Sequence, residues 1–502
     1  MNIQYLSTDF LILGGGAAGC WAALEFCKRS QGKALLLEKA NIRRSGCLAA
    51  GVNALNAYIG PGHTPQDYAD YAKNDAEGAV DEALLLSMAE RLNGTVQKLE
   101  SLGLTILKNP DGSYATRGWR NVKINGENIK PLLAGAVAQE PRITVLNQAN
   151  AFDYIVQGDR VTGAFAIAVQ SPVLYVVTAK AVLCATGGAA GLYQPNHPGF
   201  SRHKLWYPPF NTGAGYAMGV RAGAKMTGFA QRFVALRCKD TIAPTGTLAQ
   251  GVGAKQINAL GEVYEQKYGT ATMQRVRGTV RENAENRGPC YLRTAGIPQE
   301  QDDELAKAYL NMAPGQTLRW LETAPPSVQN VEIDGTEPYI TGGHTASGYA
   351  VAVDRATSLK GLFAAGDAAG GCPQKYVTGA LAEAEIAAHA ALQYMQDDPP
   401  QAPDATPVLQ TLNAYFFYDT DTVDALEEEM QGVMDAYAGG ISRQYTYTKE
   451  GLAVAESKIA AIAQKSKSCA AKDMQDLVYI LELQERLVVC QAVIAALKEV
   501  CA

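Results

Sequence analysis

The chain has 502 residues, with 44 Lys and Arg against 50 Asp and Glu and a formal net charge of −6 at pH 7. Its 47% hydrophobic and 19% charged content is ordinary for a globular protein, and the balance gives no reason to expect nucleic acid or an anionic membrane as a partner. A chain of this length exceeds what one core usually holds, so about two or three domains are expected. The expected partners are small molecules or another protein.

Targeting signals and metal-binding patterns are not expected in this chain. No stretch approaches about 18 uninterrupted apolar residues, so no membrane span is predicted. The first predicted strand begins within ten residues of Met1, which leaves no room for a signal peptide and predicts a cytoplasmic location. The ten cysteines never form Cys-x-x-Cys, which argues against an iron–sulfur cluster or structural zinc held by this chain alone. The histidines without a catalytic assignment also lack metal-ligand spacing: His63, His197, His203 and His389.

A glycine-rich turn follows the apolar run 10–13 and opens an Ala-rich helical stretch. Gly14 permits the tight turn, Gly16 lets the backbone approach a pyrophosphate, and Gly19 lets helix and strand pack closely. The helix N-terminus offers free N–H groups and the positive end of a dipole. The turn at 14–19 therefore predicts a dinucleotide site that also includes Ala17 and Ala18.

Three later strand ends support this prediction. Glu38 follows the predicted strand 34–37, about 20 residues past the glycines, where a carboxylate can bond a ribose hydroxyl. The strands that end at 182–188 and 361–367 bring backbone without bulky side chains close to a ligand. Asp367 can accept a hydrogen bond from a ribitol or ribose hydroxyl. The cofactor residues predicted here are Thr186, Gly187, Gly366 and Asp367.

The pattern changes along the chain indicate separate domains. The N-terminal part alternates like βαβ units, the stretch 240–335 is more polar and irregular, and helical periodicity fills 406–502. An inserted cap and an antiparallel helical bundle account for the last two stretches. We therefore predict an α/β nucleotide-binding domain at 1–235 and 338–396, a capping and substrate domain at 236–337, and a helical domain at 397–502.

The segments 14–19, 185–188 and 361–367 together resemble the FAD domain of the fumarate reductase and succinate dehydrogenase flavoprotein superfamily. Four further stretches are more similar to the alpha subunit of dissimilatory adenylylsulfate reductase than to the fumarate reductases: 38–46, 125–131, 232–240 and 366–379. The similarity covers nearly the whole chain. It implies an α/β fold in which a Rossmann-like FAD-binding domain carries an inserted α+β capping domain and a C-terminal helical bundle.

Two departures from the fumarate reductases refine this expectation. Those enzymes often carry a histidine after the Arg-Ser pair that bonds covalently to the flavin, whereas Gly46 follows Ser45 here, so non-covalent FAD is expected. They also clamp a substrate carboxylate with an arginine where this chain has Lys375, and lysine lacks the bidentate grip of arginine. The resemblance adds Lys39, Ser45, Gly46, Lys375 and Thr378 to the cofactor-binding residues.

Two residues match catalytic positions of the adenylylsulfate reductases. Arg237 would hold a sulfo or phosphate oxyanion, the alternative being a surface ion pair with Asp240 or a neighbour. His344, in a Gly-Gly-His loop, would donate a hydrogen bond or a proton to the leaving or entering oxyanion. An isolated histidine is otherwise most often structural.

Four residues are expected to line the substrate pocket. Asn56, over the isoalloxazine ring, and Glu127 resemble pocket residues of the family, with a plain loop contact as the alternative for each. Trp206 and Tyr207 would stack on an adenine ring, with core packing as the alternative.

The resemblance implies an FAD-dependent oxidoreductase that interconverts adenylyl sulfate with sulfite plus AMP through two-electron chemistry at flavin N5. It also implies a separate ferredoxin-like iron–sulfur subunit, while a homo-oligomer stays open. A second hypothesis is a soluble fumarate-type enoate reductase in which Arg237 supplies the proton, and Lys375 speaks against it. A third is a flavin-bearing electron-transfer subunit with a degenerate pocket, which the presence of both Arg237 and His344 disfavours.

Overall fold

The computed structural model describes residues 1–60, 62–76, 80–196, 205, 207–239, 248–310, 322–323, 325–395, 400–418 and 422–501. A seven-stranded sheet organises the N-terminal half, in the order β7-β2-β1-β10-β9-β8 with β17 also paired to β10. Strands β1, β2, β7, β10 and β17 run parallel, and β9 and β8 are added antiparallel. Their bounds are β1 Asn2–Leu13, β2 Ala34–Glu38, β7 Ile143–Asn147, β8 Ala149–Gln157, β9 Arg160–Ala168, β10 Val173–Cys184 and β17 Leu362–Ala364.

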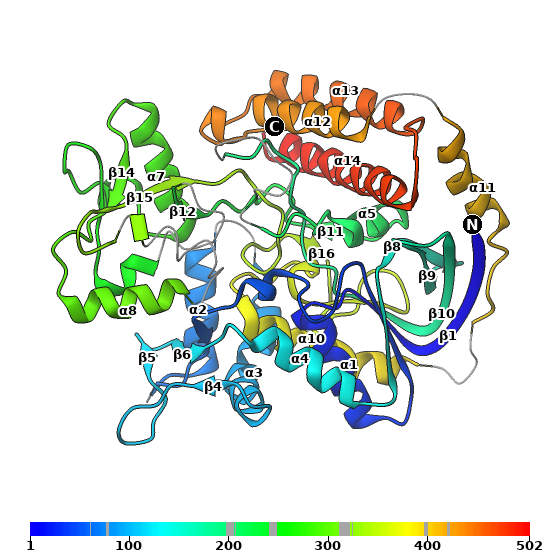
Figure 1. Ribbon diagram of the computed structural model, residues 1–502, viewed down its shortest axis with the longest axis horizontal. Coiled ribbons are helices and arrows are strands. Elements are labelled where there is room, and N and C mark those ends of the chain that lie inside the picture. The colour runs from blue at the N-terminus through cyan, green and yellow to red at the C-terminus, as the bar shows by residue number, and fades with distance from the viewer. Residues whose placement is uncertain are drawn as a thin grey trace.

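Continuous apolar runs form the central strands because both faces of the sheet are covered. Along β1, Phe10 and Ile12 point to one face, while Leu11 and Leu13 point to the other, and all four are fully buried. The first face packs on α1 Ala17–Arg29, α3 Glu82–Ser101, α4 Ile129–Gln139 and α10 Tyr376–Tyr394. The second face packs on α5 Ala214–Arg221 and on the C-terminal helices (Figure 1).

A smaller sheet, with its own hydrophobic core, lies apart from the main one. Its four antiparallel strands are β12 Leu236–Cys238, β15 Val331–Gly335, β14 Cys290–Leu292 and β13 Gln256–Ile257, in that order. Figure 1 shows β12, β14 and β15 at the left, with α7 Thr272–Ala284 and α8 Gln299–Leu310 beside them. The short helix α6 Glu265–Tyr268 precedes α7. The domain boundaries themselves stay a prediction.

The remaining short strands form two further small sheets. One four-stranded sheet contains β3 Ala54–Asn56, β6 Asn121–Asn125, β4 Thr105–Ile106 and β5 Thr116–Arg117, and a two-stranded sheet contains β11 Met226–Thr227 and β16 Gly348–Tyr349. Helix α2 Pro65–Asp75 packs on α3, and α11 Thr406–Ala414 lies close to the N-terminus (Figure 1).

Helices α12 Val423–Tyr437, α13 Lys449–Ser466 and α14 Met474–Val500 pack on one another as a bundle along one side of the molecule (Figure 1). Helix α14 is tied to the main domain by polar side chains. Arg486, only 1% exposed, donates to the carbonyls of Ala190 at 3.0 Å and Pro209 at 2.8 Å. Glu482 pairs with Lys39 at 2.8 Å. In the described part of the chain, no helix is both long and apolar enough to cross a membrane.

Candidate functional site

The glycine turn (residues 14–19) joins β1 to α1, and its first and last glycines, Gly14 and Gly19, are required by the chain itself. Gly14 has φ +100°, and a Cβ there would collide with the carbonyl of Ala185. A Cβ on Gly19 would collide with the carbonyl of Gly14. A Cβ on Gly16 would meet no protein atom within 4 Å, and no side chain caps the N-terminus of α1 there. The turn therefore leaves open backbone at the helix N-terminus, which fits a pyrophosphate.

Glu38 braces this turn from the end of β2. Its side chain is buried, and its two oxygens accept hydrogen bonds from the backbone N–H of Gly15 at 2.8 Å and of Ala40 at 2.7 Å. A carboxylate offers about four acceptor positions, so Glu38 can also accept from a ribose hydroxyl. The predicted ribose contact is thus compatible with a second, structural task.

Lys130 is a residue of this site to which the sequence alone gave no role. It is fully buried in α4, and its Nζ donates to the carbonyls of Gly15 at 2.7 Å and of Ile42. These partners are carbonyls, and within the described ranges no carboxylate is hydrogen-bonded to Nζ. A buried ammonium lacking an acidic partner is unfavourable unless an anion lies nearby, which fits a pyrophosphate at the turn. A lysine inside an otherwise apolar helix was the available signal.

The loop after β2 lies over the glycine turn. Gly46 has φ +76°, and a Cβ there would stand 3.4 Å from the Cα of Gly16. The buried Ser45 donates through Oγ to the carbonyl of Gly15 at 3.4 Å. Lys39 is directed instead to α14 by its ion pair with Glu482. Ala17 and Ala18 form the first turn of α1.

Two further strand ends, at residues 186–188 and 366–367, lie beside the turn and are called here the wall. Gly187 and Gly366 have φ values of +81° and +67°, respectively, and Thr186 lies just beyond the end of β10. The hydroxyl of Tyr207 accepts from the N–H of Gly188 at 3.0 Å and donates to the carboxylate of Asp367. Tyr207 is fully buried, with its ring centroid 5.9 Å from that of Tyr339. Tyr207 is thus packed in the core, its stacking on an adenine ring stays a prediction, and Trp206 lies outside the described residues.

Lys375 is hydrogen-bonded to the backbone of the same wall. Its Nζ donates to the carbonyls of Gly366 at 2.8 Å and Ala369 at 2.6 Å, and pairs with Glu383 at 2.9 Å. Glu383 also pairs with Arg355 at 3.1 Å, and all three charged side chains are 0% exposed. Lys375 therefore acts through the backbone turn that it holds.

Asn56 stands at the end of β3 and touches this wall through α10. Its carbonyl accepts from Oγ1 of Thr378 at 2.5 Å, which ties β3 to α10. The side chain is buried, and its Oδ1 has no hydrogen-bond partner within the described chain. Glu127, by contrast, is exposed in the loop before α4.

His344 lies in a loop that contacts the wall, because the N–H of Gly342 donates to the carbonyl of Asp367 at 3.0 Å. Its ring stacks on Phe233 with centroids 4.2 Å apart, and it lines a small cavity with Asp75, Gln231 and Gln374. A Cβ on Gly343 would collide with the carboxylate of Asp367, so that side chain would have to move. Burial lowers the pKa of His344, although the carboxylates of Asp367 and Asp75 oppose this, so the imidazole is neutral at pH 7.

Arg237 on β12 is 3% exposed and thus buried, while Asp240, the partner named in the surface ion-pair alternative, lies outside the described residues. Its Nη2 donates to the carbonyl of Asn196, and its Nη1 is buried without a partner among the described residues. Glu337 stands nearby, where burial raises its pKa, and it accepts from the N–H of Asn196 at 2.9 Å. A buried N–H that lacks a partner costs about 1–3 kcal/mol, more when charged, so an anionic ligand at Arg237 would be stabilising.

Arg237 and His344 belong to two segments that the structure holds side by side. Backbone hydrogen bonds of 2.8 Å run in both directions between Phe233 and Tyr339, and Thr336 N–H donates to Ala235 O at 2.9 Å. The segments 233–238 and 333–344, called here the paired segments, thus carry both predicted catalytic side chains.

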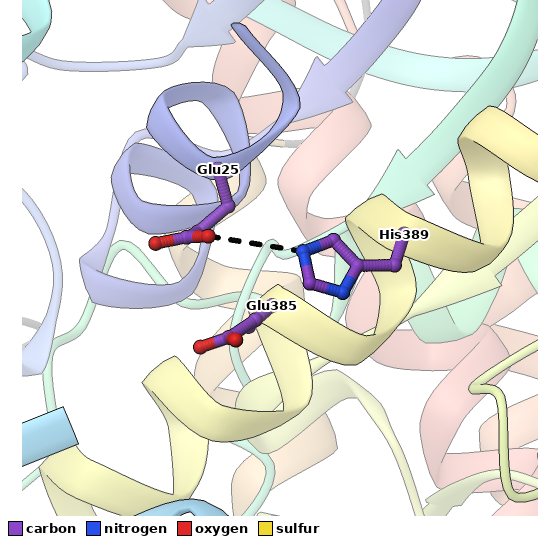
Figure 2. Close-up of side chains that lie close together, drawn as sticks. All are labelled: Glu25, Glu385 and His389. Carbon is purple, nitrogen blue, oxygen red and sulfur yellow. Dashed lines mark ion pairs between the residues drawn. The ribbon is translucent and has the colours of Figure 1, made fainter. Parts of the chain in front are cut away.

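A separate group of possible metal ligands lies between α1 and α10 (Figure 2). His389 Nε2 stands 3.7 Å from a carboxylate oxygen of Glu25, and Glu385 is the third member. The ammonium of Lys98 lies 2.6 Å from Glu385 and 3.5 Å from Glu25. We assign no metal to this cluster, because Lys98 already supplies the cation between the carboxylates.

The comparison with protein families gives the class of the molecule. A model of the FAD binding domain family matches residues 9–379, a span that includes the glycine turn, Glu38, Lys130 and Asp367. The chain belongs to this family. It binds FAD, and non-covalently, with glycine at the position where fumarate reductases often carry the histidine that bonds to the flavin.

Within that family the chain is an adenylylsulfate reductase alpha-like flavoprotein and an FAD-dependent oxidoreductase. The adenylylsulfate reductase subunit alpha of Megalodesulfovibrio gigas is 27% identical over 585 residues, which cover 96% of this chain and 87% of the relative. The solved adenylylsulfate reductase of Archaeoglobus fulgidus is 31% identical with a TM-score of 0.91, over 99% of this chain and 89% of that one. The solved structure of an adenosine-5-phosphosulfate reductase in complex with sulfite, as a covalent adduct, is 30% identical with a TM-score of 0.91. The match covers 99% of this chain and 89% of that one. The predicted fold class and the resemblance are confirmed.

Proposed function

We propose that this chain is the flavin-bearing subunit of an enzyme that interconverts adenylyl sulfate with sulfite and AMP. The observation that carries the proposal is Arg237, a 3% exposed guanidinium with an unpartnered Nη1, on a fold shared with a sulfite-binding relative. Such a group suits a ligand that is itself an oxyanion.

FAD, when bound, supplies the two-electron chemistry. The residues of the chain bind the substrate and manage its charge. The planar fork of Arg237 binds two oxygens of a sulfo or phosphate group. His344, neutral at pH 7 because of its burial, donates its N–H to a developing oxyanion, and Asn56 orients the substrate through its Oδ1.

The position of Lys375 argues against a dicarboxylate substrate. Its ammonium is fully buried and already bonded to Glu383 and two backbone carbonyls. It is therefore committed to the fold and does not serve as a clamp for a substrate carboxylate. This supports the sulfur reaction over a fumarate-type reduction.

The electrons require a partner outside the chain in this proposal. The chain holds no Cys-x-x-Cys, and the metal-ligand group found among the described residues contains no cysteine. A ferredoxin-like iron–sulfur subunit fits this composition. Co-purification from the native host, followed by native mass spectrometry, tests for that subunit and for a homo-oligomer, and cell fractionation tests the proposed cytoplasmic location.

The reaction itself is tested by reoxidation of the reduced flavin. The FAD-loaded protein is photoreduced without oxygen, and flavin absorbance is followed after adenylyl sulfate, fumarate or related enoates are added in separate cuvettes. Rapid reoxidation by adenylyl sulfate alone is expected. Reoxidation by an enoate alone would move the chain to the fumarate-type reaction, and silence with every substrate would favour an electron-transfer role.

A further inference from the structure

Asp75 is the last residue of α2, and its carboxylate is bonded to two residues far away in the chain. Oδ1 accepts from the backbone N–H of Thr272 at 3.3 Å, and Oδ2 accepts from Oγ1 of Thr272 at 2.9 Å and from Nε2 of Gln374 at 2.5 Å. A carboxylate is unfavourable at the C-terminal end of its own helix, where the helix dipole is negative. The groups that stabilise Asp75 therefore belong to other elements.

Thr272 is the first residue of α7, a helix whose N-cap residue has no hydrogen-bonding side chain. That residue is Ala271, so the side-chain acceptor for the first N–H groups of α7 must come from elsewhere. Asp75 supplies it, and the positive end of the α7 dipole favours its negative charge. The start of α7 is thus held by a side chain 197 positions earlier in the chain.

These bonds connect two parts of the molecule that have separate cores. Val276 and Val280 of α7 lie in the core of the smaller sheet, whereas Tyr68 and Ala72 of α2 lie in a core of the main sheet. Asp75 therefore fixes the first turn of α7 relative to the sheet that carries the glycine turn.

The connection lies at the cavity of His344. Thr272, Met273 and Gln374 line this cavity together with Asp75, and its volume of about 10 Å³ is close to the room that one water needs. The first turn of α7 is therefore packed closely beside the imidazole.

Gln374 is the second side chain that Asp75 orients. It is 3% exposed, and its φ of +56° is uncommon for a residue other than glycine. A carboxylate only accepts hydrogen bonds, so Asp75 fixes the amide with Nε2 towards itself. Gln374 directly precedes Lys375, which is bonded to the wall. Asp75 therefore supports the cavity on the side of the wall as well as on the side of α7.

The charge of Asp75 also acts on His344. Burial lowers the pKa of His344, and the carboxylates of Asp367 and Asp75 both oppose this fall. The rings of Phe233 and Tyr376 flank the imidazole at centroid distances of 4.2 Å and 5.4 Å, and burial raises the pKa of Tyr376, which keeps it neutral. Removal of the Asp75 charge would therefore lower the pKa of His344 further.

We propose that Asp75 is a positioning residue of the substrate side, which holds the first turn of α7 and the amide of Gln374 in place around His344. Its bonds to Thr272 and Gln374 carry the inference. The inference rests on the proposed function only for the reaction in which His344 takes part, and it gives Asp75 no contact with the substrate.

Hydrogen–deuterium exchange of the FAD-loaded chain, measured by mass spectrometry, tests the contact with α7. In D75N, the peptide that covers the first turn of α7 is expected to exchange at least tenfold faster than in wild type. D70N is the matched control, because Asp70 is exposed on the same helix and accepts from Gln66 at 2.8 Å. Unchanged exchange in D75N, or an equal acceleration in D70N, would overturn the proposal.

A second variant keeps the test decisive if D75N does not fold. T272V removes the hydroxyl donor and keeps the carboxylate, so the same peptide should exchange faster than in wild type but more slowly than in D75N. The double variant should exchange no faster than D75N, since both changes break one contact. An unchanged rate in T272V, or single effects that multiply in the double variant, would overturn the proposal.

The pKa of His344 distinguishes a positioning role from a purely structural cap. Histidine ring signals are followed by NMR through a pH titration, and H344N assigns the signal. D75N is expected to lower the pKa of His344, whereas D75E and T272V keep the negative charge and should leave it near the wild-type value. An unchanged pKa in D75N would overturn the role of Asp75 at His344.

Exchange and titration need no turnover, so they stand apart from the test of the proposed function. If adenylyl sulfate fails to reoxidise the flavin, the proposed function fails, while faster exchange and a lower His344 pKa in D75N still support this inference. Reoxidation by adenylyl sulfate together with unchanged exchange in D75N would sink this inference alone.

Discussion

The glycine turn and the paired segments differ in whether their buried polar groups have hydrogen-bond partners within the described chain. At the turn, both oxygens of Glu38 and the ammonium of Lys130 are bonded to backbone groups of the chain. On the paired segments, the buried Nη1 of Arg237 has no partner in the described chain. The cofactor cradle is therefore built by the chain, whereas the substrate side keeps bonding capacity for a ligand. Changes at the turn should remove FAD, and changes at Arg237 should remove turnover alone.

The sharpest test of this difference is the last glycine of the turn, Gly19. G19A places a methyl group against the carbonyl of Gly14 and is expected to yield protein without FAD. G16A meets no protein atom, so it should fold normally and lose FAD only because the cofactor approaches there. G94A, at an exposed position of α3, should keep FAD and gain about 0.5–1 kcal/mol of stability. The flavin-to-protein absorbance ratio after gel filtration gives the result, and full FAD content in G19A would contradict the argument.

The next largest effect is expected from the buried ion pairs of Glu383 with Lys375 and Arg355. E383Q leaves both Lys375 and Arg355 without their acidic partner, and a loss of about 3–5 kcal/mol in the free energy of unfolding is expected. K375M should destabilise less, because Glu383 keeps its pair with Arg355. Urea unfolding measures both variants. An equal loss in the two would show that Lys375 and Arg355 do not share the carboxylate as the structure indicates.

At Arg237 the comparison predicts an effect on activity without one on the cofactor. R237Q should lower kcat/KM by about 10²–10³-fold, as for the loss of one oxyanion-binding donor, with FAD content unchanged. R281Q, on the exposed face of α7, should retain wild-type activity. Steady-state kinetics with adenylyl sulfate measures both. Loss of FAD in R237Q would place Arg237 in the cofactor cradle instead.

The smallest expected effect is the pH dependence contributed by His344. Burial lowers its pKa in the folded state, so the unfolded chain binds more protons between the folded value and the ordinary value near ~6.5. The stability contribution is present above that ordinary value and is lost as pH falls through the folded pKa. H344N should therefore lose less stability than wild type between neutral and acidic pH. Parallel urea titrations across that range, with identical pH slopes in both proteins, would show that His344 is not the titrating group.

The cofactor side was largely predictable from sequence because its signals are local. A positive φ at Gly14 and the close approach at Gly19 depend on residue type at single positions, and the acid at residue 38 follows at a fixed spacing. Arg237 and His344 came from resemblance, since no local rule distinguishes them from other arginines and histidines. The structure added their burial and the pairing of their segments.

The residues that sequence left without a role are buried charges whose partners lie far away in the chain. Lys130 donates a hydrogen bond to the carbonyl of Gly15. Arg355 forms a buried ion pair with Glu383, which also pairs with Lys375. Sequence periodicity shows a charge inside an apolar segment but not what neutralises it. Tyr207 illustrates the same limit, because an aromatic side chain before a flavin strand suits stacking and packing equally until its hydroxyl partner, Asp367, is known.

The contacts of α14 bear on how the protein is made. A ribosome produces β1 and the glycine turn early, yet Arg486 and Glu482 on α14 bond to residues 190, 209 and 39 of the main domain. Those bonds form only after almost the whole chain has been synthesised, since synthesis proceeds from the N-terminus. The part of the second face that the C-terminal helices cover stays exposed until then. The last ties between the C-terminal bundle and the main domain are therefore made after translation, and interrupted translation products lack them.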